Sequence, residues 1–254
     1  MFPIIPANSA TTSFPENDEG IFGFGWNLST NLSMTNLISN TGVASSDVSG
    51  VGTARYALAA CEYGGDKGIF GFGLTYSPVV YKDETNLVSN TGVVSSDVTG
   101  VGTDRRDCRA CEYGEDKGIF GFGWTGSNLS MTNLVSNTGV VSSDVSGVGT
   151  ARNALAACEY GGDKGIFGFG NDGSNTAITN LVSNTGVVSS DQAATTGTAR
   201  TYIAACSYGG DKGIFGYGSG YTAVTNLVSN TGVVSSDVTG VGTAREALAA
   251  CSFN

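Results

Sequence analysis

Two charged residue types recur at matched positions along the chain and could form carboxylate–guanidinium pairs. In each of five repeats, the tripeptide Ser-Ser-Asp is followed eight or nine residues later by the Arg of Gly-Thr-X-Arg. General acid–base catalysis needs two groups in unlike environments, and five equal copies offer no such difference. We therefore expect a structural pair or loop clamp, in which the Asp accepts hydrogen bonds from loop amides. The carboxylates are Asp47, Asp97, Asp144, Asp191 and Asp237, and the guanidiniums are Arg55, Arg105, Arg152, Arg200 and Arg245.

Five of the six cysteines also occupy equivalent positions, one in each repeat. If the repeats are arranged in a ring, as argued below, equivalent residues lie too far apart for disulfides, which need Cα atoms within about 7 Å. Cys108 and Cys111 share one extended segment and are separated by about 10 Å. We expect six reduced thiols that act as small hydrophobic side chains, which favours a reducing compartment or a virion-associated protein over a secreted one. A ring of thiols around a metal is the alternative. The repeated cysteines are Cys61, Cys111, Cys158, Cys206 and Cys251.

The composition narrows the possible functions. The 254 residues include no His, which excludes Ser-His-Asp and Cys-His catalysis and His-ligated zinc or haem. The formal net charge of −10 argues against nucleic-acid binding, because affinity for phosphates comes from Lys and Arg. No apolar run approaches the roughly 20 residues that span a membrane. We expect a monomer without a cofactor. A Ca²⁺ ion held by Asp side chains of the loops is left as an open alternative, because the sequence has no residue spacing that is diagnostic of such a site.

A repeat of about 48 residues must position all of these side chains. Gly-Ile-Phe-Gly-Phe-Gly begins at residues 20, 68, 118 and 165, and a variant with Tyr217 in place of the second Phe begins at residue 213. Each copy contains four short segments with strand character and no segment with helical periodicity. In the second copy these segments are residues 69–72, 85–89, 93–96 and the run that ends at Cys111.

A repeated four-stranded unit of this length predicts the blade of a β-propeller. We expect an all-β domain over residues 20–254 with five four-stranded antiparallel blades, preceded by a tail over residues 1–19. The first strand, Gly20 to Phe24, lacks a preceding partner, and the last run, Ala247 to Phe253, lacks a following one. Pairing of these two strands would close the ring and remove two open edges. A linear β-solenoid is the alternative.

The order of motifs is similar to that of kelch repeats, which pair a strand ending in two glycines with a later Pro-Thr-Ala-Arg-like element. Here a strand ending in Gly-Phe-Gly, a middle segment, Gly-Thr-Ala-Arg and a strand of small residues follow one another across residues 20–254. The chain therefore resembles the kelch repeat family, and the resemblance implies the blade layout. By size, five blades of this length also resemble a tachylectin-type sugar-binding propeller.

Nine of the twelve Phe residues lie in the Gly-Ile-Phe-Gly-Phe-Gly copies. Strand alternation would place the two Phe of each copy on one face of the sheet, with Ile and Gly on the other. Stacked sheets could then pack a bulky face against a face notched by glycine. We therefore expect these Phe side chains to form the core rather than to bind a ligand.

Two regions break the repeat and are candidate functional sites. The loop after each Gly-Phe-Gly differs between copies and carries both Trp residues, and equivalent loops must gather on one face of a ring. Aromatic side chains on Ser-, Gly- and Asn-rich loops suit recognition of sugars or protein surfaces, although unconstrained loops would also vary. The second region is residues 104–109, where charged residues replace Ala and Leu of the other copies. These residues could form an anion site at the ring centre. Alternatively, Arg109 could form an ion pair with Asp107 or Glu115. The candidate ligand-binding residues are Trp26, Tyr76, Tyr81, Trp124, Asp172, Tyr221, Arg106 and Arg109.

These features predict a non-enzymatic binding module whose ligand is a glycan or a protein surface. One alternative is a structural component of a virion or another assembly. A second alternative is an enzyme that uses a carboxylate or the Arg side chains of residues 104–109 at the ring centre.

Overall fold

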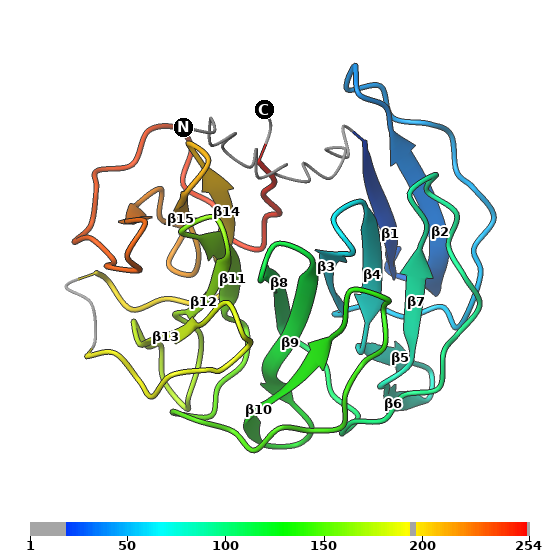
Figure 1. The fold of residues 1–254 in the computed structure, drawn as a ribbon, viewed down its shortest axis with the longest axis horizontal. Coiled ribbons are helices and arrows are strands. Elements are labelled where there is room, and N and C mark those ends of the chain that lie inside the picture. Colours follow the sequence, from blue (N-terminus) through cyan, green and yellow to red (C-terminus); the bar gives the residue numbers. More distant parts are fainter. Residues whose placement is uncertain (1–18, 194–196, 253–254) are drawn as a thin grey trace, which may run out of the picture.

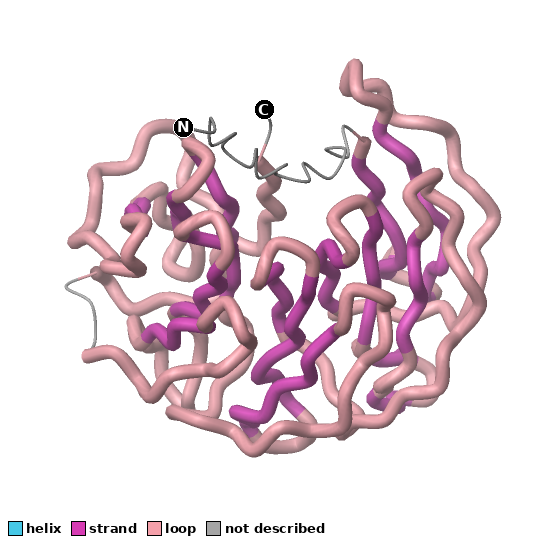
Figure 2. Tube along the Cα trace, in the orientation of Figure 1, coloured by secondary structure: helices cyan, strands magenta, loops and turns pink. Residues whose placement is uncertain are grey.

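The computed structural model describes residues 19–193 and 197–252. Within these residues the chain is all-β, with short antiparallel strands joined by long loops and without any helix (Figure 2). Accordingly, the described part of the chain contains no helix that could cross a membrane. Of the tail expected over residues 1–19, all but Glu19 lies outside the described residues.

The strands form small antiparallel sheets that follow the repeats. The first sheet has two strands, β1 (Gly20–Trp26) and β2 (Asn31–Ile38). The second sheet has three strands, and a separate hairpin of β5 (Leu74–Tyr76) and β6 (Val79–Tyr81) follows its middle strand. The strands of the second sheet are β3 (Ala59–Tyr63), β4 (Lys67–Gly71) and β7 (Thr85–Val88).

Three further three-stranded sheets repeat the order of the second. In each, an inner strand that carries a repeated Cys pairs with a Gly-Ile-Phe strand, which pairs in turn with a Thr-Asn-Leu strand. The third sheet contains β8 (Arg109–Tyr113), β9 (Lys117–Trp124) and β10 (Asn128–Val135); the fourth contains β11 (Ala156–Tyr160), β12 (Lys164–Gly168) and β13 (Thr179–Val182); the fifth contains β14 (Ala204–Tyr208), β15 (Lys212–Gly216) and β16 (Thr225–Val228).

The expectation of four-stranded blades is wrong for the outermost segment. In the second repeat this segment forms isolated bridges with β7, Thr85 with Val98 and Val88 with Val94, and no continuous ladder. Side chains take the place of a continuous ladder: the amide of Leu87 donates to the hydroxyl of Ser95 at 2.9 Å. Ser side chains compete with strand ladders in this way, so the sequence has strand character without forming a fourth strand.

The five sheets follow one another in an arc around a common centre (Figure 1). The inner strands β3, β8, β11 and β14 lie nearest that centre, and each lies against the next. Within the described residues the expected pairing of the two chain ends is absent: residues 247–252 form no strand, β1 pairs only with β2, and Phe253 lies outside the described residues. In the other sheets a tight turn connects the inner strand directly to its partner strand. The two ends of the chain have no such connection, so their pairing would have to form without a local turn.

The core lies between neighbouring sheets, where a phenylalanine ring of one sheet covers a glycine of the sheet before it. A Cβ atom built on Gly121 would lie 2.7 Å from the ring of Phe167, and one on Gly71 would lie 2.8 Å from Phe120. Only glycine allows this approach, so the expected packing of bulky against notched faces is confirmed. We call each such position a glycine notch; the four are Gly23, Gly71, Gly121 and Gly168.

The expectation that both Phe of a copy share one face is wrong. Phe70 packs on Phe24 of the first sheet, with ring centroids 5.2 Å apart, whereas Phe72 packs on Phe120 of the third sheet at 5.1 Å. The two rings therefore point to opposite neighbours. The cause is the backbone of Phe72, whose φ of 64° lies in the left-handed region and breaks the alternation of the strand.

An arginine in each connection ties the sheet before it to the sheet after it. The guanidinium of Arg152 lies over the Phe122 ring of the third sheet, 4.1 Å from its centroid. It donates to the Phe169 carbonyl at 2.9 Å and to Asn180 Oδ1 at 2.6 Å, both in the fourth sheet. We call this arrangement an arginine clamp. The contact with the ring and the hydrogen bond to Asn recur at four arginines, all with 0% exposure: Arg55, Arg105, Arg152 and Arg200. The bond to the carbonyl recurs at Arg55 and Arg200 but not at Arg105.

The repeated Asp side chains support the clamps. Asp191 accepts hydrogen bonds from the Thr150 amide and hydroxyl at 3.1 and 2.7 Å, and from Asn180 Nδ2 at 3.0 Å. The expectation that these carboxylates accept loop amides is therefore confirmed for Asp97, Asp144, Asp191 and Asp237. However, Asp97, Asp144 and Asp237 each meet the Arg of the preceding repeat rather than their own, as in the 3.8 Å contact between Arg55 and Asp97. Burial raises the pKa of Asp97, but the hydrogen bonds from Thr53 and Asn86 outweigh this effect and lower it overall.

Candidate binding site

Exposed aromatic side chains of the first two repeats meet in one cluster. Trp26, at the end of β1, stacks on Tyr56 with ring centroids 5.8 Å apart and an interplanar angle of 25°. Tyr76, at the end of β5, lies 5.4 Å from Trp26 at an angle of 41°. Trp26 is 39% exposed and Tyr76 is 52% exposed, so both rings offer surface to solvent. We call Trp26, Tyr56 and Tyr76 the aromatic shelf.

Two short turns hold the shelf. In the turn from β1 to β2, Asn27 Oδ1 accepts the amides of Ser29 and Thr30 at 3.1 and 2.8 Å. In the hairpin of β5 and β6, the hydroxyl of Thr75 donates to the Pro78 carbonyl at 2.9 Å. An Asn or Thr side chain that binds nearby backbone fixes a turn without a large core. The shelf is therefore surrounded by amide and hydroxyl groups on ordered turns.

Sequence reasoning found Trp26 and Tyr76 but missed Tyr56. The structure shows that the residue after each clamp arginine lies beside the residue after Gly-Phe-Gly, as in the bridges of Tyr56 with Leu74 and Arg106 with Trp124. This position varies between copies within an otherwise constant motif, and it is Tyr, Arg, Asn, Thr and Glu in order. That variation was a usable signal, because only variable positions distinguish one copy from another.

The other predicted aromatic residues do not join the shelf. Trp124 is half-buried at the end of β9, where it forms the bridge to Arg106. Tyr81 is half-buried and pairs with Leu74 across the small hairpin. Tyr221 is 70% exposed on a loop of the fifth sheet. The shelf is therefore the one place where predicted aromatic residues contact each other in the described part of the chain.

The predicted charged residues are also dispersed. Arg106 pairs with Asp107 at 2.8 Å, and in the described part of the chain Arg109 forms no ion pair with Asp107 or Glu115, the two partners considered above. Arg109 instead donates to the carbonyl of Cys108 at 2.8 Å and lies on β8, apart from Arg106. Asp172 accepts the amide and hydroxyl of Ser174, at 3.1 and 3.2 Å, and so shapes its own turn. These contacts favour local structural roles over a shared anion site.

The cysteines line the contacts between inner strands as free thiols. The sulfur of Cys61 fills the space beside Gly118 of the third sheet, where a Cβ atom would lie 2.6 Å from it, and Cys111 and Cys158 repeat the arrangement one and two sheets further on. Burial raises the pKa of the Cys158 thiol to about 12. Thiols held in the protonated form are poor nucleophiles and poor metal ligands. Independently, the described residues contain no group of three or more His, Cys, Asp or Glu side chains that could hold a metal ion.

Three successive inner strands each carry a glutamate at the same position. Burial, together with the charges of Glu62 and Glu159, raises the pKa of Glu112 to about 8. Burial and the charge of Glu62 likewise raise the pKa of Glu159 to about 7. The fourth equivalent position is Ser207. The inner strands thus gather negative charge that costs stability when all three carboxylates are ionised.

We expect the free energy of unfolding to fall as pH rises from about 5 to 9. Because the pKa of Glu112 is raised on folding, the folded state binds more protons across this window than the unfolded state, and stability declines with pH. Glu112→Gln should flatten the profile and stabilise the protein at pH 9 by about 1–2 kcal/mol, after allowance for solvent screening. Urea unfolding at pH 5, 7 and 9 measures this. Ser207→Glu, which adds a carboxylate at the equivalent position, should steepen the profile; a flat wild-type profile would contradict the prediction.

Comparison with known proteins adds no family. No protein-family model matches the chain, and no curated protein matches its sequence. The aromatic shelf and the sheets that carry it are therefore the features that point to a function.

Proposed function

We propose that the chain is a five-bladed, kelch-like β-propeller that acts as a non-enzymatic binding module. Support for the architecture comes from five copies of one motif and from five sheets that follow one another around a centre (Figure 1). Support for a binding role comes from the division between constant and variable parts. The notches and clamps are the same in successive repeats, whereas the loops at the ends of the Gly-Phe-Gly strands differ. Rigid scaffolds with variable loops are typical of recognition proteins.

The ligand that the aromatic shelf fits best is a neutral glycan. The single observation that carries this proposal is the contact of Trp26 with Tyr56 and Tyr76, which leaves large ring surfaces exposed. Flat aromatic faces bury the apolar C–H faces of sugar rings, and the amides and hydroxyls of the adjoining turns can bind sugar hydroxyls. The net charge of −10 disfavours acidic glycans, since like charges repel.

Trp26→Ala should weaken glycan binding at least about tenfold, because it removes the central ring of the shelf. Tyr76→Ala should have a similar effect. Binding is measured on an array of neutral and acidic glycans and then by titration calorimetry with the glycans that bind. Tyr221→Ala is the matched control, since Tyr221 is more exposed than either ring yet lies outside the shelf. The proposal fails if the wild-type protein binds no glycan, or if Tyr221→Ala weakens binding as much as Trp26→Ala.

A further inference from the structure

A buried polar atom lies beside the aromatic shelf without a hydrogen-bond partner. Asn31 begins β2 directly opposite Trp26, the last residue of β1, so the two side chains leave the same face of the first sheet. Asn31 as a whole is half-buried, but its Oδ1 atom is buried and accepts no hydrogen bond from the described residues. Buried polar atoms of side chains nearly always have a partner, so this oxygen calls for an explanation.

The third repeat shows which partner is missing. There Asn128, at the start of β10, takes the place of Asn31 and lies opposite Trp124. Its Oδ1 atom accepts a hydrogen bond from Asn153 Nδ2 at 2.6 Å, and Asn153 directly follows a clamp arginine. In the first repeat the residue after the clamp arginine is Tyr56, which brings an aromatic ring instead of an amide.

The backbone around the two asparagines is the same, so the exchange of Asn for Tyr accounts for the missing partner. The Arg55 amide donates to the Leu32 carbonyl at 3.3 Å. In the third repeat the Arg152 amide donates to the Leu129 carbonyl at 3.1 Å. The residue after each arginine therefore holds the same position beside β2 as beside β10. What differs is the side chain, which supplies a shelf ring in one repeat and a hydrogen-bond donor in the other.

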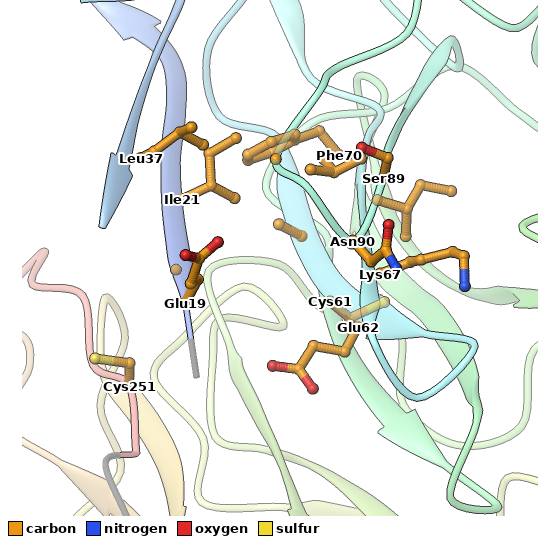
Figure 3. A pocket seen from close by; sticks show the side chains of 16 residues that line it. Glu19, Ile21, Leu37, Cys61, Glu62, Lys67, Phe70, Ser89, Asn90 and Cys251 are labelled. Carbon is orange, nitrogen blue, oxygen red and sulfur yellow. The ribbon is translucent and has the colours of Figure 1, made fainter. Parts of the chain in front are cut away.

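The unpartnered oxygen lies apart from the cavity between the first and second sheets. That cavity has a volume of about 330 Å³ and is lined by Gly20 and Ile21, where β1 begins (Figure 3). Trp26 and Asn31 lie at the other end of the same strand pair, and neither lines the cavity. The exposed rings of the shelf are thus the binding surface next to Asn31.

We propose that Asn31 is a specificity-determining residue of the shelf, which binds one hydroxyl group of a sugar that lies on the rings. This inference rests on the proposed function and deepens it. A sugar stacked on Trp26 carries its hydroxyl groups at the edge of its ring, and Asn31 is the cross-strand neighbour of Trp26. The sugar hydroxyl takes the place that the Asn153 amide holds in the third repeat. A hydroxyl group also suits either orientation of the Asn31 amide, since it donates to Oδ1 and accepts from Nδ2.

An unpaired amide beside a stacking surface selects among sugars. The faces of Trp26 and Tyr76 contact any sugar with an apolar face, so they discriminate little between one sugar and another. A sugar without a hydroxyl group at the matching position leaves the Asn31 oxygen buried and unpaired, and it therefore binds more weakly than a sugar that has one. The rings thus supply affinity, and Asn31 supplies the choice of sugar.

Thermal unfolding without a ligand tests whether the oxygen lacks a partner within the protein. Asn31→Leu replaces the amide with an apolar side chain of similar size, so Tm should stay within about 1 °C or rise, because no hydrogen bond is lost. Asn128→Leu is the matched control and should lower Tm by roughly 2–4 °C, because Asn153 Nδ2 loses its acceptor. An equal loss in both variants shows that Asn31 has a structural partner and overturns the proposal.

Glycan binding tests the role of Asn31 in recognition. On the array of neutral glycans and by titration calorimetry, Asn31→Leu should weaken binding at least about threefold, whereas Asn128→Leu should leave it unchanged. Monodeoxy analogues of the bound sugar then identify the hydroxyl group. The wild-type protein should bind one analogue more weakly than the parent sugar, and Asn31→Leu should bind that analogue and the parent sugar alike.

The assignment of Asn31 and the proposed function fail in different ways. If Trp26→Ala loses glycan binding while Asn31→Leu keeps both the affinity and the preference among analogues, the shelf binds glycans but Asn31 does not select them. That result overturns the assignment alone. If the wild-type protein binds no glycan on the array, the proposed function fails and the assignment of Asn31 fails with it.

Discussion

Arg152→Ala is expected to lower the free energy of unfolding by about 3–5 kcal/mol. The side chain has 0% exposure and serves two sheets at once, through the Phe122 ring on one side and the Phe169 carbonyl and Asn180 on the other. Burial lowers the pKa of Arg152 to about 10, so the group still carries its charge at neutral pH. Its removal leaves buried acceptors without a donor and opens a cavity between the sheets.

Urea unfolding followed by circular dichroism measures this loss. Arg152→Lys should recover only a small part of it, because an ammonium group cannot reproduce the planar fork that serves several acceptors. Arg106→Ala is the control: its side chain is 37% exposed and its one ion pair, with Asp107, lies near the surface. That control should change stability by less than about 1 kcal/mol. A loss for Arg152→Ala no greater than for Arg106→Ala would show that the clamp does not join the sheets.

Phe167→Ala is expected to cost about 3–5 kcal/mol. The ring has 0% exposure, packs against Phe122 with centroids 5.2 Å apart, and covers the notch at Gly121. Gly121→Ala alone should also destabilise the protein, by about 1–3 kcal/mol, since its methyl group would lie too close to the ring.

The two variants should be strongly non-additive. Once Phe167 is Ala, the methyl group of Gly121→Ala has space, so the double variant should cost clearly less than the sum of the two single variants. Chemical unfolding of the four proteins gives this double-mutant cycle. Additive losses would mean that the ring does not sit in the notch.

Sequence periodicity predicted the repeats and the all-β class, but the sheets have two or three strands rather than four. The five copies, the all-β class, the strands at residues 69–72 and 85–89, and the burial of the Phe side chains all follow from patterns that short strands impose on sequence. The opposite directions of Phe70 and Phe72 did not follow. The left-handed φ of Phe72 interrupts alternation, and a phenylalanine at positive φ carries no signal in a single sequence.

The partners of charged groups were the least predictable feature. Asp97 precedes Arg105 by eight residues, yet its guanidinium contact is Arg55 of the repeat before. In a chain of near-copies, the next residue of a given type is equally available in every repeat, so spacing alone cannot identify the one in contact. The shelf shows the same limit: the loops of Trp26 and Tyr76 were found from their variation, but the stacking of Tyr56 between repeats depends on how two sheets are rotated relative to each other.

The notches and clamps have a consequence for the history of the gene. Each joint uses side chains that nearly every repeat carries, so the joint does not depend on which two copies are adjacent. Unequal recombination that duplicated or deleted one whole copy would therefore encode a chain whose units still fit their neighbours. Selection could then change the number of units and the tips of their loops separately.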